Sequence, residues 1–364
     1  MYLLQVGAKD EATALFWVAV GMTSQGVARL LGGPLWGMLS DRVGRKKMFV
    51  RALYSAALTA FVLSLIHAPW QVAIALGLQG LLSGFIPAAV ALMTVSVPES
   101  RVKNALTSVS GGQYIGTAIG PAVGAGMAIA FGYRGAIFTS GLLVAAVATA
   151  VIFLVPTDTV RRAAEAQRSG KQTLTPFKPT LQLGLAILLY FSLFALGAFR
   201  TIATPIALKD IAAGDVAVVN GVTFALGGLA SAIGVWALST RFFGKRSVRH
   251  VLAAMLALSA VGHVLLALSG TAWLYISAFT AASFLNAAMM PMTNTMIAFN
   301  VDRERRGTAF GFASAAQALG FMVGPMSAAL FASFSLKAGF VTVGLLLAAL
   351  AVLVGVAVRE PEAG

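Results

Sequence analysis

One short polar run carries the residue types needed for a charged contact at a helix end. It extends from Gly37 to Lys47 and reads Gly-Met-Leu-Ser-Asp-Arg-Val-Gly-Arg-Lys-Lys. Asp41 is suited to the positive amino-terminal end of a neighbouring helix and to pairing with Arg45. Glycine permits close helix approach at one end of the run and a tight turn at Gly44. The run predicts a polar contact that uses Gly37, Asp41, Arg42, Gly44 and Arg45. In the alternative interpretation, its basic residues only set the orientation of the chain in a membrane.

A second run places glycines four residues apart, at Gly116, Gly120 and Gly124, with Pro121 between them. Glycines at this spacing form a flat helix face on which a neighbouring helix can pack closely. Pro121 removes one backbone hydrogen bond and bends the helix. Ordinary tight packing in a membrane is the simpler explanation for the same pattern.

Several polar or polarisable residues lie inside otherwise apolar segments. Arg29 stands twelve residues before Asp41, about 18 Å along a helix, and so close to the middle of a bilayer. Charge at that depth predicts a cavity-facing role in substrate binding or gating, with hydrogen bonding to backbone carbonyls as the alternative. The remaining candidates for a shared cavity are Gln79, Gln113, Tyr114, Asn286, Met290 and Gln317. A neutral polar group of this kind, taken alone, more often forms an interhelical hydrogen bond than contacts a substrate.

Acidic residues are missing from every apolar segment, so the sequence contains no obvious buried carboxylate for proton coupling. The group that binds the coupling proton would then lie in a segment before this chain, or it would be His263. In the third alternative, transport is not coupled to protons. His263 and Arg200 lie near the outer ends of their segments, where a structural histidine and a snorkelling arginine are expected. Arg29 without a matching acid favours neutral or anionic ligands.

These residues must be positioned by membrane-spanning helices. The chain has 364 residues, is 59% hydrophobic and 10% charged, and has a mean hydropathy of +0.87. Apolar stretches of about 20 residues are long enough to cross a bilayer. Eleven are predicted, at 12–40, 48–67, 71–95, 104–131, 133–155, 181–206, 216–239, 248–268, 272–298, 308–334 and 336–358.

The net charge of +14 follows the connections between these stretches. Of 26 Lys and Arg residues, 20 fall in alternate connections or at the carboxyl end, which predicts that those parts face the cytoplasm. Nucleic-acid binding is not expected, because the basic residues form no contiguous groove. With no cysteine, thiolate chemistry and disulfides are excluded, and no histidine cluster suggests a metal site.

An internal repeat divides the chain. Residues 96–123 align with 300–327 at a constant shift of 204, which pairs Arg101 with Arg305 and Gln113 with Gln317. A polar stretch separates five predicted spans from six. The predicted organisation is therefore an amino-terminal bundle (1–155), a cytoplasmic linker (156–180) and a carboxyl-terminal bundle (181–364).

The run from Gly37 to Lys47 resembles the loop signature of the major facilitator superfamily, and the run from Gly116 to Gly126 resembles that family's antiporter motif. A third family feature is only partly present, since Leu76 occupies the place of an arginine before Gln79 and Gly80. The resemblance implies two pseudo-symmetric helical bundles with 11 visible transmembrane helices of an expected 12, most of the first being absent. It also implies that the Asp41 run holds the halves together in the outward-facing state.

The function implied is secondary transport, foremost the proton-coupled efflux of hydrophobic small molecules or drugs by a monomer in a bacterial inner membrane. Its partners would be the substrate, protons and the lipid bilayer, with no cofactor. The carboxyl terminus would be cytoplasmic. A carrier of a metabolite, sugar or organic acid with the same fold, and a non-transporting truncated scaffold, are the alternatives. An enzyme is not expected, because no phosphate-binding loop or paired buried carboxylates are present.

Overall fold

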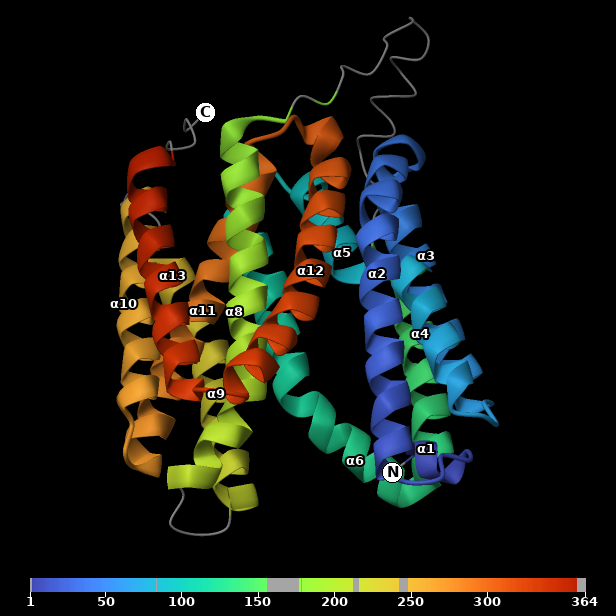
Figure 1. The fold of residues 1–364 in the computed structure, drawn as a ribbon. Coiled ribbons are helices and arrows are strands. Elements are labelled where there is room, and N and C mark those ends of the chain that lie inside the picture. Colours follow the sequence, from blue (N-terminus) through green and yellow to red (C-terminus); the bar gives the residue numbers. More distant parts are fainter. Residues whose placement is uncertain are drawn as a thin grey trace, which may run out of the picture. The chain divides into compact units, whose positions relative to one another are not determined.

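The structure is a computed structural model that describes residues 2–82, 84–155, 177, 179–211, 216–241 and 248–358, a few helical positions by their backbone alone. Every regular element in these ranges is a helix, in agreement with the predicted all-α fold (Figure 1). The helices are α1 (Tyr2–Gln5), α2 (Glu11–Val43), α3 (Arg45–Ser64), α4 (Trp70–Leu82), α5 (Phe85–Ser96), α6 (Glu99–Leu154), α8 (Leu181–Ile211), α9 (Val216–Arg241), α10 (Val248–Leu268), α11 (Ala272–Phe299), η1 (Arg303–Arg305), α12 (Arg306–Ala332) and α13 (Leu336–Ala357).

Each of the eleven predicted spans corresponds to helix, and a glycine lies at each of the two places where the division into helices differs. Two predicted spans merge in α6, which is interrupted by the non-helical backbone of Gly132 (φ 69°). One predicted span is divided into α4 and α5 at Gly84, whose φ of 111° is a left-handed conformation that disfavours other residues. Among the described residues, nine helical stretches are long and apolar enough to cross a membrane.

The first compact unit comprises residues 1–98, 119–178 and 301–319. In it α2 packs on α4, and α3 packs on both α4 and α5. The approach of α2 and α4 is close, because a Cβ at Gly32 would lie 2.5 Å from the carbonyl oxygen of Leu81. The unit also takes in η1 and the first part of α12, although these belong to the later half of the sequence.

The second compact unit comprises residues 99–118, 179–300 and 320–364. In it α10 packs on α11 and α13, and α11 packs on α8 and α9. The unit takes in the start of α6, which is the repeat counterpart of the α12 segment in the first unit. Each unit therefore contains one segment from the opposite sequence half, an exchange that the predicted bundle boundaries did not include. The predicted linker lies almost entirely outside the described residues.

Candidate functional site

The predicted run from Gly37 forms the end of α2, a turn and the start of α3. At the turn, Gly44 has a φ of 110°, and its N–H donates to the carbonyl oxygen of Ser40 at 3.0 Å. This positive φ is readily adopted by glycine and brings the helix ends together, so that Asp41 on α2 faces Arg45 on α3. Arg45 Nη2 lies 2.9 Å from Asp41 Oδ1, and both side chains are almost fully buried. Arg42 is exposed.

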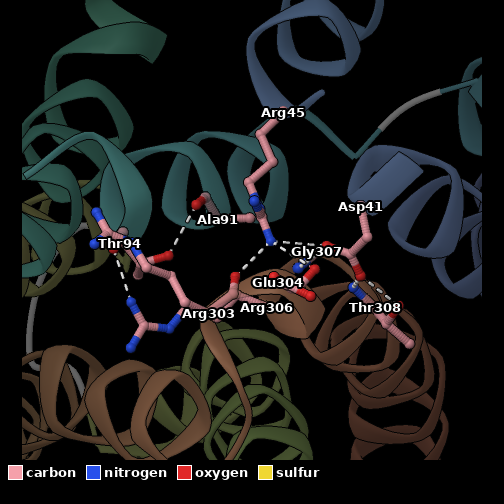
Figure 2. Close-up of polar contacts among 9 residues, drawn as sticks. All are labelled: Asp41, Arg45, Ala91, Thr94, Arg303, Glu304, Arg306, Gly307 and Thr308. Atoms are coloured by element: carbon pink, nitrogen blue, oxygen red, sulfur yellow. Dashed lines mark hydrogen bonds and ion pairs between the residues drawn. The ribbon is translucent and has the colours of Figure 1, made fainter. Parts of the chain in front are cut away.

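Asp41 caps the amino-terminal end of α12, a helix from the other half of the sequence (Figure 2). The backbone N–H of Gly307 donates to Asp41 Oδ1 at 2.8 Å, and that of Thr308 donates to Oδ2 at 2.7 Å. The Thr308 hydroxyl donates to the same Oδ2 at 2.5 Å. The carboxylate thus satisfies donors that a helix start leaves without intrahelical partners. The sequence led us to expect this geometry, although it did not indicate which helix Asp41 would cap.

Arg45 extends the contact from Asp41 to the segment before α12. Its Nη2 also donates to the carbonyl oxygens of Arg303, at 2.7 Å, and Glu304, at 2.9 Å. One guanidinium nitrogen therefore connects the carboxylate to η1 (Figure 2). Guanidinium groups suit such sites because they carry several donors in a fixed plane.

Two further arginines connect η1 and α12 to the carboxyl-terminal end of α5. Arg303 Nη2 donates to the carbonyl oxygen of Val95 at 2.6 Å, and Arg306 Nη1 donates to that of Thr94 at 2.8 Å. The carbonyls at a helix end lack intrahelical donors and favour cations. From the sequence, these two arginines are predicted only to help orient the chain in the membrane. Nothing in the sequence around them indicates a contact with α5. We call Asp41, Arg45, Arg303, Arg306, Gly307 and Thr308 the Asp41 cluster.

Opposing effects act on the carboxyl group of Asp41 in the cluster. Asp41 is one residue beyond the predicted span, and burial raises the pKa of its carboxyl group, against the opposing effects of Arg45 and of the donors from Thr308 and Gly307. Burying the carboxylate therefore costs free energy that is offset only while these partners are in place. A cluster of this kind can form or separate as a unit.

The helices beneath the cluster cross at glycines. A Cβ added at Gly37 would lie 2.5 Å from the carbonyl oxygen of Gly307 and 2.7 Å from Gly311 Cα. A Cβ added at Gly311 would lie 2.6 Å from the carbonyl oxygen of Gly33. Backbone therefore contacts backbone between α2 and α12. The prediction that Gly37 permits close helix approach agrees with this geometry. Gly33, Gly307 and Gly311 were missed, although both helices carry glycines four residues apart, which is the spacing that indicates such a crossing.

The glycines of the second predicted motif are placed differently. No described atom lies within 4 Å of a Cβ added at Gly116, Gly120 or Gly124. Among the described residues, no neighbouring helix packs closely on this face, since the spacing creates a flat face but does not by itself supply a partner. In the repeat counterpart, a Cβ at Gly320 would lie 2.8 Å from Phe194 Cβ. The side chain of Pro121 lies outside the described side chains.

The candidate cavity residues are divided between the units: Arg29, Gln79 and Gln317 belong to the first, and Gln113, Tyr114, Asn286 and Met290 to the second. Gln79 accepts a 2.6 Å hydrogen bond from Gln25 Nε2, which favours its interhelical role. Gln317 and Met290 are buried, while Gln113 and Tyr114 are half-buried.

Arg29 and Asn286 keep a buried polar atom, Nε and Oδ1 respectively, without a hydrogen-bond partner among the described residues. Either atom is available to a ligand or a water molecule. The structure does not assign either residue to a substrate, so their binding role stays a prediction.

Arg200 corrects one expectation. It does not snorkel, because its side chain is only 7% exposed and its guanidinium lies 4.9 Å from the centre of the Phe279 ring. Packing in the second unit, which the sequence could not reveal, keeps this residue inside. His263 makes a structural contact, with Nδ1 2.8 Å from the carbonyl oxygen of Ser259.

Comparison with known proteins identifies the family. The sequence model described as Major Facilitator Superfamily matches residues 12–248 and 223–364, which together include most of the chain. The chain belongs to the Major Facilitator Superfamily. The family resemblance and the all-α membrane fold are thereby confirmed, and the chain is a multi-pass membrane transporter rather than an enzyme.

Among curated relatives, "Multidrug resistance protein MdtG" of Proteus mirabilis is 28% identical over 349 residues, covering 93% of this chain and 85% of that protein. The protein of that name in Enterobacter lignolyticus is 26% identical over 371 residues, covering 100% and 87%. These proteins are similar over nearly the whole chain.

Two solved structures support the fold. The human organic anion transporter MFSD10 (TETRAN) has a TM-score of 0.77 at 19% identity and covers 97% of this chain and 87% of its own. The E. coli fucose:proton symporter FucP has a TM-score of 0.71 at 15% identity, with coverage of 94% and 91%. At these identities the likeness concerns the fold alone.

Proposed function

We propose that this protein exports hydrophobic small molecules across a bacterial inner membrane, with inward proton flow as the driving force. The relatives named as multidrug resistance proteins support export of drugs, and the glycine motif from Gly116 resembles that of exporters. The charge distribution supports a cytoplasmic carboxyl terminus, because 20 of the 26 basic residues fall in alternate connections or at that end. The working unit is a monomer.

The observation that carries the mechanism is the capping of α12 by Asp41. This contact joins an early and a late helix of the sequence inside one compact unit, through buried groups that are costly to leave unpaired. In the proposed cycle, the Asp41 cluster holds this end of α2 and α12 closed and separates when the end opens. Access would then alternate between the two sides of the membrane.

The substrate site in this proposal lies near mid-membrane and includes Arg29, Gln79, Gln113, Tyr114, Asn286, Met290 and Gln317. Arg29 supports a preference for neutral or anionic substrates, since a cationic one would meet an uncompensated positive charge. Met290 belongs to a methionine group around Pro291, and flexible thioethers suit apolar ligands of varied shape.

The test is the accumulation of a panel of fluorescent drugs in cells that produce the chain, the Asp41→Asn variant or neither, with and without a proton uncoupler. We expect the chain to lower accumulation, the uncoupler to abolish this effect, and Asp41→Asn to reduce it about tenfold or more, as for the loss of a charged hydrogen bond. Asp210→Asn is the matched control, since Asp210 is exposed near the end of α8.

Accumulation that is the same with and without the chain, at equal membrane levels of protein, would contradict drug export. A saturable uptake of a sugar or organic acid would then identify a metabolite carrier of the same fold.

A further inference from the structure

A small cavity lies inside the first unit, beside the break between α4 and α5. Its volume is about 30 Å³. Space of this size admits about two water molecules or one monatomic ion, and excludes an organic substrate. It is bordered by residues of α2, α3, α5 and α12, including Ser40, Arg51, Gly84, Gly311 and Ser314.

The break leaves backbone carbonyls at the end of α4, and two cationic or polar side chains satisfy them. Trp36 Nε1 donates to the carbonyl oxygen of Leu81 at 2.6 Å, and Arg51 Nη1 donates to that of Leu82 at 2.9 Å. The Arg51 guanidinium also lies 3.7 Å from the centre of the Trp36 ring. Arg51 is thus held at the cavity by two contacts, to the carbonyl oxygen of Leu82 and to the Trp36 ring, and neither is to a carboxylate.

Three polar atoms that border this cavity have no partner. They are Ser40 Oγ, Ser314 Oγ and Arg51 Nε, each buried and without a hydrogen bond among the described residues. Ser40 is 4% exposed and Ser314 is 1% exposed, so bulk water does not satisfy them. Buried polar groups are normally hydrogen-bonded, and three unpaired ones around a single cavity indicate an occupant.

The charge at the cavity selects the sign of that occupant. No acidic residue borders it, and Arg51 contributes a positive charge. Arg51 forms no ion pair with another residue in the described part of the chain. Gly84, which borders the cavity, is also the residue before the start of α5, and no side chain caps this helix start. The amino-terminal end of a helix attracts negative charge.

We propose that this cavity binds a single monatomic anion, with chloride as the physiological ligand. Arg51 Nε and the hydroxyls of Ser40 and Ser314 donate to the anion. The anion compensates the half-buried charge of Arg51 and thereby stabilises the arrangement of α12 beside the broken span. The site is separate from the proposed substrate cavity and does not depend on the direction of transport.

The test measures thermal unfolding of the purified full chain in detergent, with chloride replaced by gluconate at constant sodium and ionic strength. We expect a saturable rise in melting temperature with chloride and with bromide. Ser314→Ala should raise the half-saturating chloride concentration about tenfold or more, because it removes one hydrogen bond to a charged ligand. Ser277→Ala is the control, since its exposed hydroxyl donates within its own helix.

Crystals grown in bromide provide the second measurement, and an anomalous peak between Arg51 and Ser314 is expected. Equal melting temperatures in chloride and gluconate would overturn the proposal. An anomalous map without this peak, or a Ser314→Ala variant with unchanged chloride dependence, would do so too and would assign the cavity to water.

Discussion

Asp41 is the residue on which the candidate site depends, because it accepts hydrogen bonds from two helices at once. Its carboxylate receives the backbone donors of Gly307 and Thr308 and the guanidinium of Arg45. An amide side chain has one acceptor oxygen and no charge, so it cannot reproduce this set of contacts. In the later part of the sequence, Leu238, Ser239 and Arg241 match Leu39, Ser40 and Arg42, which places Thr240 at the position of Asp41. The side chain of Thr240 lies outside the described side chains.

We predict that Asp41→Asn opens the cluster. The chain contains no cysteine, so one cysteine introduced as Thr94→Cys is a clean reporter at a position that is 0% exposed. Loss of a charge-assisted hydrogen bond, worth about 1.5–3 kcal/mol, should raise the rate of maleimide labelling at this cysteine about tenfold or more. Asp210→Asn in the same background is the control. Unchanged labelling in the Asp41→Asn protein would show that the cluster does not hold this end closed.

At the scale of elements, the decisive feature is the crossing of α2 and α12 through glycines. Helices in a membrane gain little from the hydrophobic effect and associate by packing and hydrogen bonds, so backbone contact between them matters. Here Gly33 and Gly37 face Gly307 and Gly311. The glycines of α6 have the same spacing, but no atom in the described part of the chain lies within 4 Å of a Cβ added at Gly116, Gly120 or Gly124, so spacing alone does not establish a crossing.

Alanine substitutions should separate these two kinds of glycine. Gly311→Ala places a Cβ 2.6 Å from a backbone oxygen, and we expect the free energy of unfolding to fall by about 1–3 kcal/mol, as for overpacking. Gly116→Ala meets open space and should leave stability unchanged or raise it by up to about 1 kcal/mol, because alanine favours helix. Thermal or denaturant unfolding in detergent measures both. Equal losses for the two variants would be inconsistent with the crossing described.

At the scale of the whole molecule, the distribution of charge predicts the orientation of the chain in the membrane. The basic residues gather in alternate connections, and the opposite connections and the amino terminus hold only Lys9, Arg134, Lys209 and Lys337. Short positive loops remain on the cytoplasmic side during insertion. This prediction concerns the whole chain, because the opposite orientation would place every loop on the other side of the membrane.

Two single-cysteine variants test this orientation. Lys337→Cys should react with a membrane-impermeant maleimide in intact cells, whereas Lys103→Cys should react only after permeabilisation. Both positions are exposed, so accessibility within the protein is matched. Labelling of Lys103→Cys in intact cells would reverse the proposed orientation and place the carboxyl terminus outside.

The sequence by itself determined the class of molecule. Hydropathy and charge act on each segment separately in a bilayer, so the spans, their interruption by polar loops and the family motifs could be read from short stretches. That Asp41 would contact the amino-terminal end of a helix and pair with Arg45 could likewise be predicted from the local sequence.

The tertiary structure alone decided which partners these residues have. It assigned α12 to Asp41, backbone carbonyls of η1 and α5 to Arg45, Arg303 and Arg306, and a buried position beside Phe279 to Arg200. It also broke one predicted span at Gly84. Partners that lie far apart in the sequence are chosen by the packing of whole helices. The local sequence around a glycine or an arginine is the same whether or not another helix covers that residue.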